Sequence, residues 1–240
     1  MQYNGYFGCG FCTSKGQRIR KVVGSVLVFS LQDKIPSNRT HQMSLKQSNL
    51  AIEQNISNAG GVKGLSLLYL LPGFDIFKGQ IPDCMQCVLL GIVRQFLNIW
   101  LTSSGELCFI RDVDVKLINE FILSVSPPDE LLRILIPLTT YWNLWKASEC
   151  RSWLLFYSPV VLRNILPGAY YHHWLLLVNG MRLLLRPSVS CKEIEKVMLL
   201  FCKFVNQIPT LYGIQHVSYN VHFLLHVVEI GRASCRERVS

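Results

Sequence analysis

Apolar side chains recur at helical spacing along most of the chain after Pro82, and this pattern limits the fold more than any other feature of the sequence. Glycine and proline interrupt the pattern at short intervals, which sets limits on the individual helices. Strand patterns are few, so the expected fold class is mainly α. The expected helices cover about 82–104, 113–126, 129–136, 141–157, 170–185, 190–205 and 220–228.

The longest apolar runs are broken by charged, imidazole or proline side chains. The chain has 240 residues, of which 50% are hydrophobic and only 16% charged, so a membrane-spanning segment has to be considered. A spanning helix needs roughly 20 consecutive apolar residues. Arg94 interrupts the run 87–101, Pro159 and Arg163 interrupt 153–166, and Arg182 lies within 171–185. These breaks favour core helices and no membrane partner, with a helical membrane protein as the alternative.

The chain is basic, with a formal net charge of +9, and its nine cysteines are an odd number. No basic segment followed by an apolar run opens the chain, so the cysteines indicate a reducing, intracellular compartment rather than a secreted disulfide framework. Lys15, Arg18, Arg20 and Lys21 form the densest group of cations. That group can bind phosphate, or it can be an ordinary solvated loop.

The composition divides the chain into four segments. Residues 1–32 are expected to form a Cys-rich knuckle with a short strand within 22–31, and 33–64 a polar linker that can hold one helix near 44–55. Residues 65–228 are the helical region. Residues 229–240 lack a hydrophobic period, and EIGRASCRERV is similar to the translation of a sequencing adapter, so we expect a non-native tail; a genuine basic tail is the alternative.

Two pairs of side chains have metal-ligand spacing. Cys9 and Cys12 form a C-x-x-C in a glycine-rich turn, a spacing at which two thiolates can bind one zinc ion. His222 and His226 lie four positions apart on an expected helix, so both imidazoles are on one face. A chance cysteine pair, a redox pair and two core histidines are the alternatives.

A second C-x-x-C and a lone glutamate complete the candidates. Cys84 and Cys87 could close a four-thiolate site with the first pair, although 75 residues separate the pairs and packing suits Cys87 better. Glu149 lies between Trp145 and Trp153 in an aromatic-rich segment. A carboxylate in such a place is either paired with a neighbouring cation, Lys146 or Arg151, or is a metal ligand.

Six segments in order resemble the central and C-terminal catalytic region of CACTA (En/Spm)-type DNA transposases and of the animal transposase-domain proteins related to them. The resemblance covers nearly all of residues 2–228, and the ordered combination is more specific than any single motif. The segments are YNGYFGCGFC, GVKGLSLL, IPDCMQCVLLGIVRQF, WKASECRSWLLFYS, ILPGAYYHHWLLLV and LYGIQHVSYNVHFLLH.

The resemblance implies a ribonuclease-H-like core with a helical insertion, of which this chain would hold the truncated C-terminal part. Two aspartates and a glutamate hold two Mg²⁺ ions in such enzymes, which cleave DNA and transfer strands. Glu149 matches the catalytic glutamate, whereas both aspartates would precede Met1. Because one carboxylate cannot hold two mutually repelling Mg²⁺ ions, we expect no DNA cleavage by this chain.

The resemblance also implies a metal site that draws on Cys9, Cys12, Asp83, His222 and His226. Gln86 stands where the family has a histidine after its aspartate, so little or no Zn²⁺ is expected. The expected function is that of a nuclear, transposon-derived fragment, with residual DNA binding or protein contacts through the helical region. A domesticated, non-catalytic DNA- or protein-binding module is the alternative.

Overall fold

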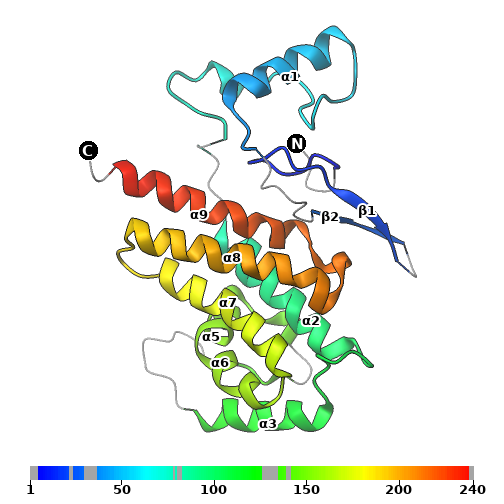
Figure 1. Ribbon diagram of the computed structural model, residues 1–240, viewed down its shortest axis with the longest axis vertical. Coiled ribbons are helices and arrows are strands. Elements are labelled where there is room, and N and C mark those ends of the chain that lie inside the picture. The colour runs from blue at the N-terminus through cyan, green and yellow to red at the C-terminus, as the bar shows by residue number, and fades with distance from the viewer. Residues whose placement is uncertain are drawn as a thin grey trace. The chain divides into compact units, whose positions relative to one another are not determined.

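The computed structural model describes residues 5–21, 24–29, 37–77, 79, 83–125, 135–138 and 142–237. Its described part is mainly helical and contains one two-stranded sheet, as Figure 1 shows. The chain divides into two compact units. Unit 1 comprises Met1–Pro82 with Val205–Ser240, and unit 2 comprises Asp83–Phe204, so the division cuts across the segments expected from composition.

The N-terminal part of unit 1 is a glycine-rich turn followed by a hairpin. Strands β1 (Gln17–Arg20) and β2 (Ser25–Val28) pair antiparallel, with Gln17 opposite Val28. The second strand lies within the expected region 22–31. The first strand was not expected. Its side chains are largely exposed, and with Arg18 and Arg20 in it the sequence lacks the apolar pattern from which a strand is predicted.

The rest of unit 1 is helical. Helix α1 (His41–Glu53) begins after Thr40, whose hydroxyl accepts the backbone N–H of Met43, and it overlaps the helix that the linker segment was expected to hold near 44–55. A 3-10 turn covers Leu67–Leu70. Helix α9 (Tyr219–Glu237) follows a 3-10 turn at Ile214–His216. This helix begins one residue before its expected start and continues past residue 228, its expected end.

Unit 2 begins with a long helical segment whose first part is wound as a π-helix. Met85–Val93 is π-helical and continues directly into α2 (Arg94–Thr102), and Gly105, with φ 96°, follows the end of the helix. Helix α3 covers Asp112–Ser124. The helix expected over 129–136 lies mostly outside the described residues. On these helical segments the apolar side chains of Met85, Val113 and Leu117 are exposed.

A broken helical segment follows, where one continuous helix was expected over 141–157. Trp142–Leu144 forms a 3-10 turn, α5 covers Ala147–Ser152, Trp153–Tyr157 is π-helical, α6 covers Ser158–Val161, and Leu162–Asn164 is again 3-10. Pro159 has no N–H to offer the carbonyl of Leu155. Arg182 donates a hydrogen bond to that carbonyl instead, so the proline is tolerated inside the helical segment.

Helices α7 (Gly168–Leu184) and α8 (Cys191–Tyr212) are the longest of the elements that contribute to unit 2. Ser190 and Glu193 form the expected capping box at the start of α8, with the Ser190 hydroxyl accepting the Glu193 N–H at 3.3 Å. Aromatic side chains fill the core between these helices and α2. The ring centroids of Trp100 and Trp174 are 4.9 Å apart in an edge-to-face arrangement.

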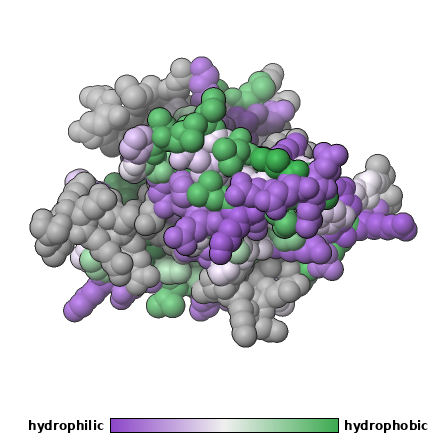
Figure 2. All heavy atoms as spheres, turned by 90° about the horizontal axis from the view of Figure 1, so that it is seen from above, coloured by the Kyte–Doolittle hydropathy of each residue, from purple (hydrophilic) through white to green (hydrophobic). Residues whose placement is uncertain are grey.

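On the face drawn in Figure 2, hydrophobic side chains gather mainly in one area beside a broad hydrophilic one. One stretch of the described chain, Met85–Thr102, is apolar and long enough to cross a membrane, although 39% of it is buried within the fold. The core helix of a soluble protein meets the same criterion. Arg94, in the middle of this stretch, donates a hydrogen bond to the backbone carbonyl of Trp145.

Candidate metal centre

The turn at Cys9–Cys12 presents two sulfurs that are ready to act as ligands. The Sγ of Cys9 accepts the backbone N–H of Phe11 at 3.4 Å, and the Sγ of Cys12 accepts that of Ser14 at 3.4 Å. Both cysteine side chains are fully buried. Backbone N–H groups aimed at sulfur stabilise the thiolate, which is the form of cysteine that binds metal.

Helix α9 supplies two imidazoles to the same place. The Nε2 atom of His226 lies 3.4 Å from the Sγ of Cys9, and that of His222 lies 3.3 Å from the Sγ of Cys12. The two Nε2 atoms are 3.3 Å apart. All four ligand atoms lie within 4.8 Å of one another, and all four residues are buried.

These separations fit a tetrahedral zinc ion. Zn–S bonds of about 2.3 Å and Zn–N bonds of about 2.0 Å give ligand–ligand edges of about 3.3–3.8 Å in a tetrahedron. The two sulfur–nitrogen distances, 3.4 and 3.3 Å, and the nitrogen–nitrogen distance, 3.3 Å, lie in that range. The donor set is therefore a buried Cys₂His₂ group that could hold a metal such as zinc.

Aromatic rings enclose the two histidines. Phe11 stacks on His226 with ring centroids 5.5 Å apart, and Phe29 lies 5.4 Å from His222. The backbone N–H of Phe29 donates to the carbonyl of Val217 at 3.1 Å, which ties the end of β2 to the residues just before α9. An apolar shell of this kind keeps water from the ligand atoms.

A buried arginine holds the cysteine turn from the other side. The Nε of Arg39 donates to the carbonyl oxygens of Cys9, at 3.0 Å, and Cys12, at 2.9 Å, and its guanidinium also reaches Gln47 and the carbonyl of Phe7. Only 6% of Arg39 is exposed. Its charge favours thiolates on both cysteines, so Arg39 acts on the ligands through geometry and charge together.

The contact between the two thiols shifts their pKa values in opposite directions. Hydrogen bonding from Cys12 lowers the pKa of Cys9, helped by hydrogen bonds from His222 and His226 and opposed by burial. The same bond, together with burial, raises the pKa of Cys12. The lowered pKa of Cys9 favours its thiolate form, and a metal ion would displace the proton from Cys12.

Asp83 and the residues around it do not join this group. Asp83 belongs to unit 2, where its Oδ1 accepts the backbone N–H groups of Met85 and Gln86 at 2.8 and 3.3 Å. It thereby caps the helical segment that begins at Met85 and continues into α2. The expectation of little zinc assumed that position 86 was needed. Among the described residues the four-ligand group is formed without positions 83 and 86.

The second C-x-x-C has the character of packed thiols. Burial raises the pKa of Cys84 and raises that of Cys87 to about 11, and in both cases Asp83 adds to the shift. Neither residue belongs to the Cys₂His₂ group. The interpretation of Cys87 as a packing residue fits this environment better than a four-thiolate site does.

Glu149 is buried at the start of α5, with 3% of its surface exposed. Its Oε2 accepts the backbone N–H of Lys146 at 2.7 Å, so the carboxylate caps the helix. Within the described ranges no ion pair is formed with Lys146 or Arg151. The sequence placed Glu149 correctly in a buried environment but suggested a side-chain pairing where there is a backbone hydrogen bond.

Arg39 is the functional residue that the sequence did not indicate. It lies in the segment assigned to a polar linker, and a single arginine between Asn38 and Thr40 has no distinguishing pattern. The bridge between Cys12 and Asn38, which brings Arg39 beside the cysteine turn, joins residues 26 positions apart. Such a contact leaves no local signal.

No protein-family model matches this chain, and neither a curated protein nor a solved structure is significantly similar to it.

Proposed function

We propose that this chain is a zinc-stabilised module of a transposon-derived nuclear protein that associates with DNA and does not itself cleave it. The parent reaction would be metal-dependent DNA cleavage and strand transfer on a ribonuclease-H-like core. The order of the six resembling segments and the basic net charge of +9 support this assignment. The buried Cys₂His₂ group carries the zinc part of the proposal.

A zinc ion at this place would be structural. Four protein ligands complete a tetrahedron and leave no open position for water or substrate. The ion would join residues 9 and 12 to residues 222 and 226, which lie more than 200 positions away along the chain. Cross-linking such distant residues removes conformational freedom from the unfolded chain, so metal binding would stabilise unit 1 directly.

The catalytic half of the parent reaction would be missing. Glu149, the residue that matches the catalytic glutamate, has its carboxylate engaged with a backbone N–H. A paired-Mg²⁺ centre needs several anionic oxygens close together. Purified chain incubated with supercoiled DNA and Mg²⁺ or Mn²⁺ should give no nicked product beyond that of Glu149→Gln. Divalent-dependent nicking that this substitution abolishes would contradict the proposal.

Metal analysis tests the zinc centre. We expect about one zinc per chain by mass spectrometry of the purified protein, and close to none for Cys12→Ser, which removes one ligand. Cys191→Ser is the matched control, since Cys191 is exposed and outside the ligand group. Equal zinc content in Cys12→Ser and Cys191→Ser would refute the site.

The salt dependence of binding distinguishes the proposed DNA-associated module from the alternative, a domesticated protein-binding module. Binding to DNA through phosphates weakens steeply as salt rises, because counterions are released when lysine and arginine neutralise phosphates. A gel shift at 50 and 200 mM salt should therefore show much weaker binding at the higher concentration. If the chain binds no duplex DNA at either salt concentration, the DNA part of the proposal is wrong, whereas the zinc part is unaffected.

A further inference from the structure

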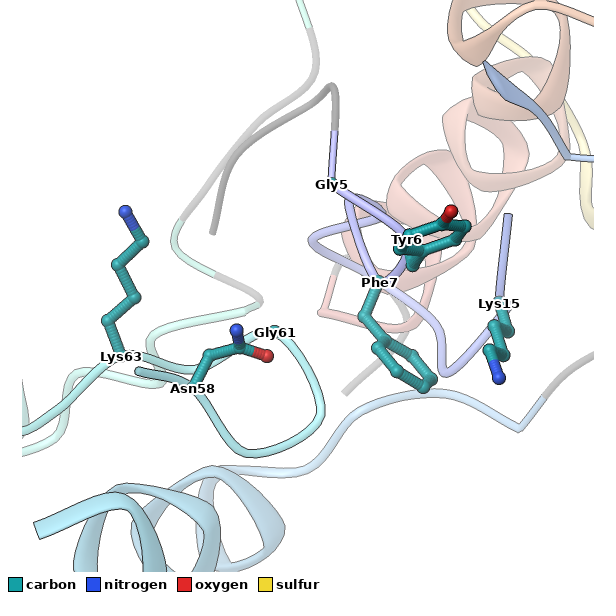
Figure 3. A pocket seen from close by; sticks show the side chains of 7 residues that line it. All are labelled: Gly5, Tyr6, Phe7, Lys15, Asn58, Gly61 and Lys63. Carbon is teal, nitrogen blue, oxygen red and sulfur yellow. The ribbon is translucent and has the colours of Figure 1, made fainter. Parts of the chain in front are cut away.

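An open hollow of about 620 Å³ lies in unit 1 beside the cysteine turn, as Figure 3 shows. One wall comes from the segment just before and after the cysteines, with Tyr6, Phe7 and Lys15. The other comes from the loop after α1, with Asn58, Gly61 and Lys63. The volume lies within the range of about 300–1,000 Å³ that is usual for small-molecule sites.

The described residues of the lining combine two lysines with one exposed and one half-buried aromatic ring, and no carboxylate is among them. Lys15 and Lys63 are exposed, and 49% of Tyr6 is exposed. The Nζ of Lys15 lies 5.9 Å from the centroid of Phe7, and the guanidinium of Arg18 lies 5.9 Å from that of Tyr6. Positive charge interleaved with accessible rings suits a ligand that has both phosphates and planar bases.

The walls are held in place by the backbone around the candidate metal centre. Gly61 has φ 89°, and a Cβ on it would lie 2.5 Å from the carbonyl oxygen of Phe7, so the loop approaches the cysteine turn where only glycine fits. Arg39, which donates to the carbonyls of Cys9 and Cys12, also reaches that of Phe7. The close approach at Gly61 and the hydrogen bonds of Arg39 therefore hold both walls of the hollow in place before a ligand binds.

We propose that this hollow binds single-stranded nucleic acid, with one base stacked on Tyr6 and flanking phosphates bound by Lys15 and Lys63. The proposal rests on the proposed association with DNA and adds the strand form and the site. Bases in a duplex are already stacked on one another and cannot cover a side-chain ring, whereas unpaired bases can. The aromatic wall therefore favours a single strand over a duplex.

Fluorescence anisotropy of a labelled oligothymidylate of about 12 nucleotides tests the proposal on the full-length, zinc-loaded chain. We expect tighter binding than to a duplex of the same length. Tyr6→Leu should weaken single-strand binding by about 5- to 100-fold through lost stacking. Lys15→Gln with Lys63→Gln should lower the slope of log affinity against log salt by about 0.7 for each lysine that leaves a phosphate.

Two controls match these variants. Phe156→Leu removes a ring that is 50% exposed on unit 2, and Lys116→Gln with Lys192→Gln removes two exposed charges from unit 2. Both controls should bind the oligonucleotide as the parent chain does. Zinc content, measured for every variant, confirms that the cysteine turn is intact.

Each outcome decides between the two proposals. If the chain binds duplex DNA, and Tyr6→Leu and Lys15→Gln with Lys63→Gln bind the single strand as their controls do, the hollow is not the binding site. The proposed association with DNA then still stands. If neither nucleic acid is bound by the zinc-loaded chain, both are refuted. A polyglutamate competitor as effective as unlabelled oligonucleotide would mean that the hollow recognises acidic chains in general, which also overturns the proposal.

Discussion

Arg39 shows how one buried charge can support a candidate metal centre without belonging to its ligand group. Its guanidinium donates to the carbonyls of both cysteines and has no carboxylate partner within the described part of the chain. Burial lowers the pKa of Arg39, and the neighbouring Cys9 and Cys12 oppose that shift. The arginine and the thiolates thus depend on each other, since either charge alone would be costly to bury.

Arg39→Gln should weaken zinc affinity by about 10- to 100-fold, as substitutions around metal ligands commonly do. The shorter neutral side chain removes the donors to the carbonyls of Cys9 and Cys12 and the charge that favours thiolates. Competition with a chromophoric chelator measures the change. Arg20→Gln, an exposed position of the same unit, is the control, and equal affinities for the two variants would contradict the role.

His173 is a second residue whose charge state depends on the fold. Burial lowers its pKa from 6.5 to about 4, against the hydrogen bond that its Nε2 donates to the carbonyl of Phe204 at 2.9 Å. Its ring stacks on Phe204 at 4.3 Å. The unfolded chain therefore binds a proton between pH 6.5 and 4 that the folded chain does not, and stability falls as pH falls through that window.

Urea titrations of zinc-loaded protein at pH 7 and pH 4.5 should reveal this dependence. The free energy of unfolding should lose up to about 3 kcal/mol from His173 on acidification, and His173→Gln should remove that loss. His172→Gln, at the exposed neighbouring position, should retain the full acid sensitivity. The same pH dependence in both variants would show that His173 does not carry it.

Spacing identified Cys9, Cys12, His222 and His226 as candidates, because two ligands one turn apart are a local pattern. The spacing within each pair does not show whether the two pairs come together in the fold. That outcome depends on the contact between β2 and the residues before α9, which joins Phe29 to Val217. Nor could it reveal that Asp83 and Glu149 use their carboxylates to cap helices.

At the scale of elements, the helices with apolar period and clear caps were predicted closely. The expected helix over 170–185 is α7 at Gly168–Leu184, and the Ser190–Glu193 capping box does begin α8. The broken segment after Trp142 was not predicted. Beside its π-helical turn, the carbonyl of Leu155, which Pro159 cannot bind, accepts a hydrogen bond from Arg182 of α7, and periodicity carries no information on such a partner.

Close packing of α7 and α8 gives a prediction at the same scale. A Cβ on Gly180 would lie 2.2 Å from a ring carbon of Phe201, so Gly180→Ala should cost about 1–3 kcal/mol in unfolding free energy despite the better helix propensity of alanine. Gly168→Ala is the matched control, since the nearest atom to its new Cβ is 3.9 Å away. Comparable stability of the two variants in urea would contradict the packing argument.

At the scale of the whole molecule, the chain contains two units with different sources of stability. Unit 2 has a core of aromatic rings from several helices, including Phe96, Trp100 and Trp174. Unit 1 has two short strands, the helices α1 and α9, and a buried ligand group that joins the cysteine turn to α9. Small structures with little apolar core commonly depend on a metal for stability.

Removing zinc with a chelator should therefore affect the units unequally. Hydrogen exchange followed by mass spectrometry should show faster exchange over 5–29 and in the first turns of α9, where Cys9, Cys12, His222 and His226 lie. Helix α7 should keep its protection. Uniform acceleration across both units, or no change in either, would contradict separate sources of stability.

The separation of the ligand pairs along the chain has a consequence for biosynthesis. A ribosome makes Cys9 and Cys12 more than 200 residues before His222 and His226. Domains generally fold as they emerge, N-terminal parts first. Here the cysteine turn would wait with an incomplete ligand set until more than 200 further residues had been made, so the two ligand pairs would meet late and would depend on the metal available in the cell at that moment.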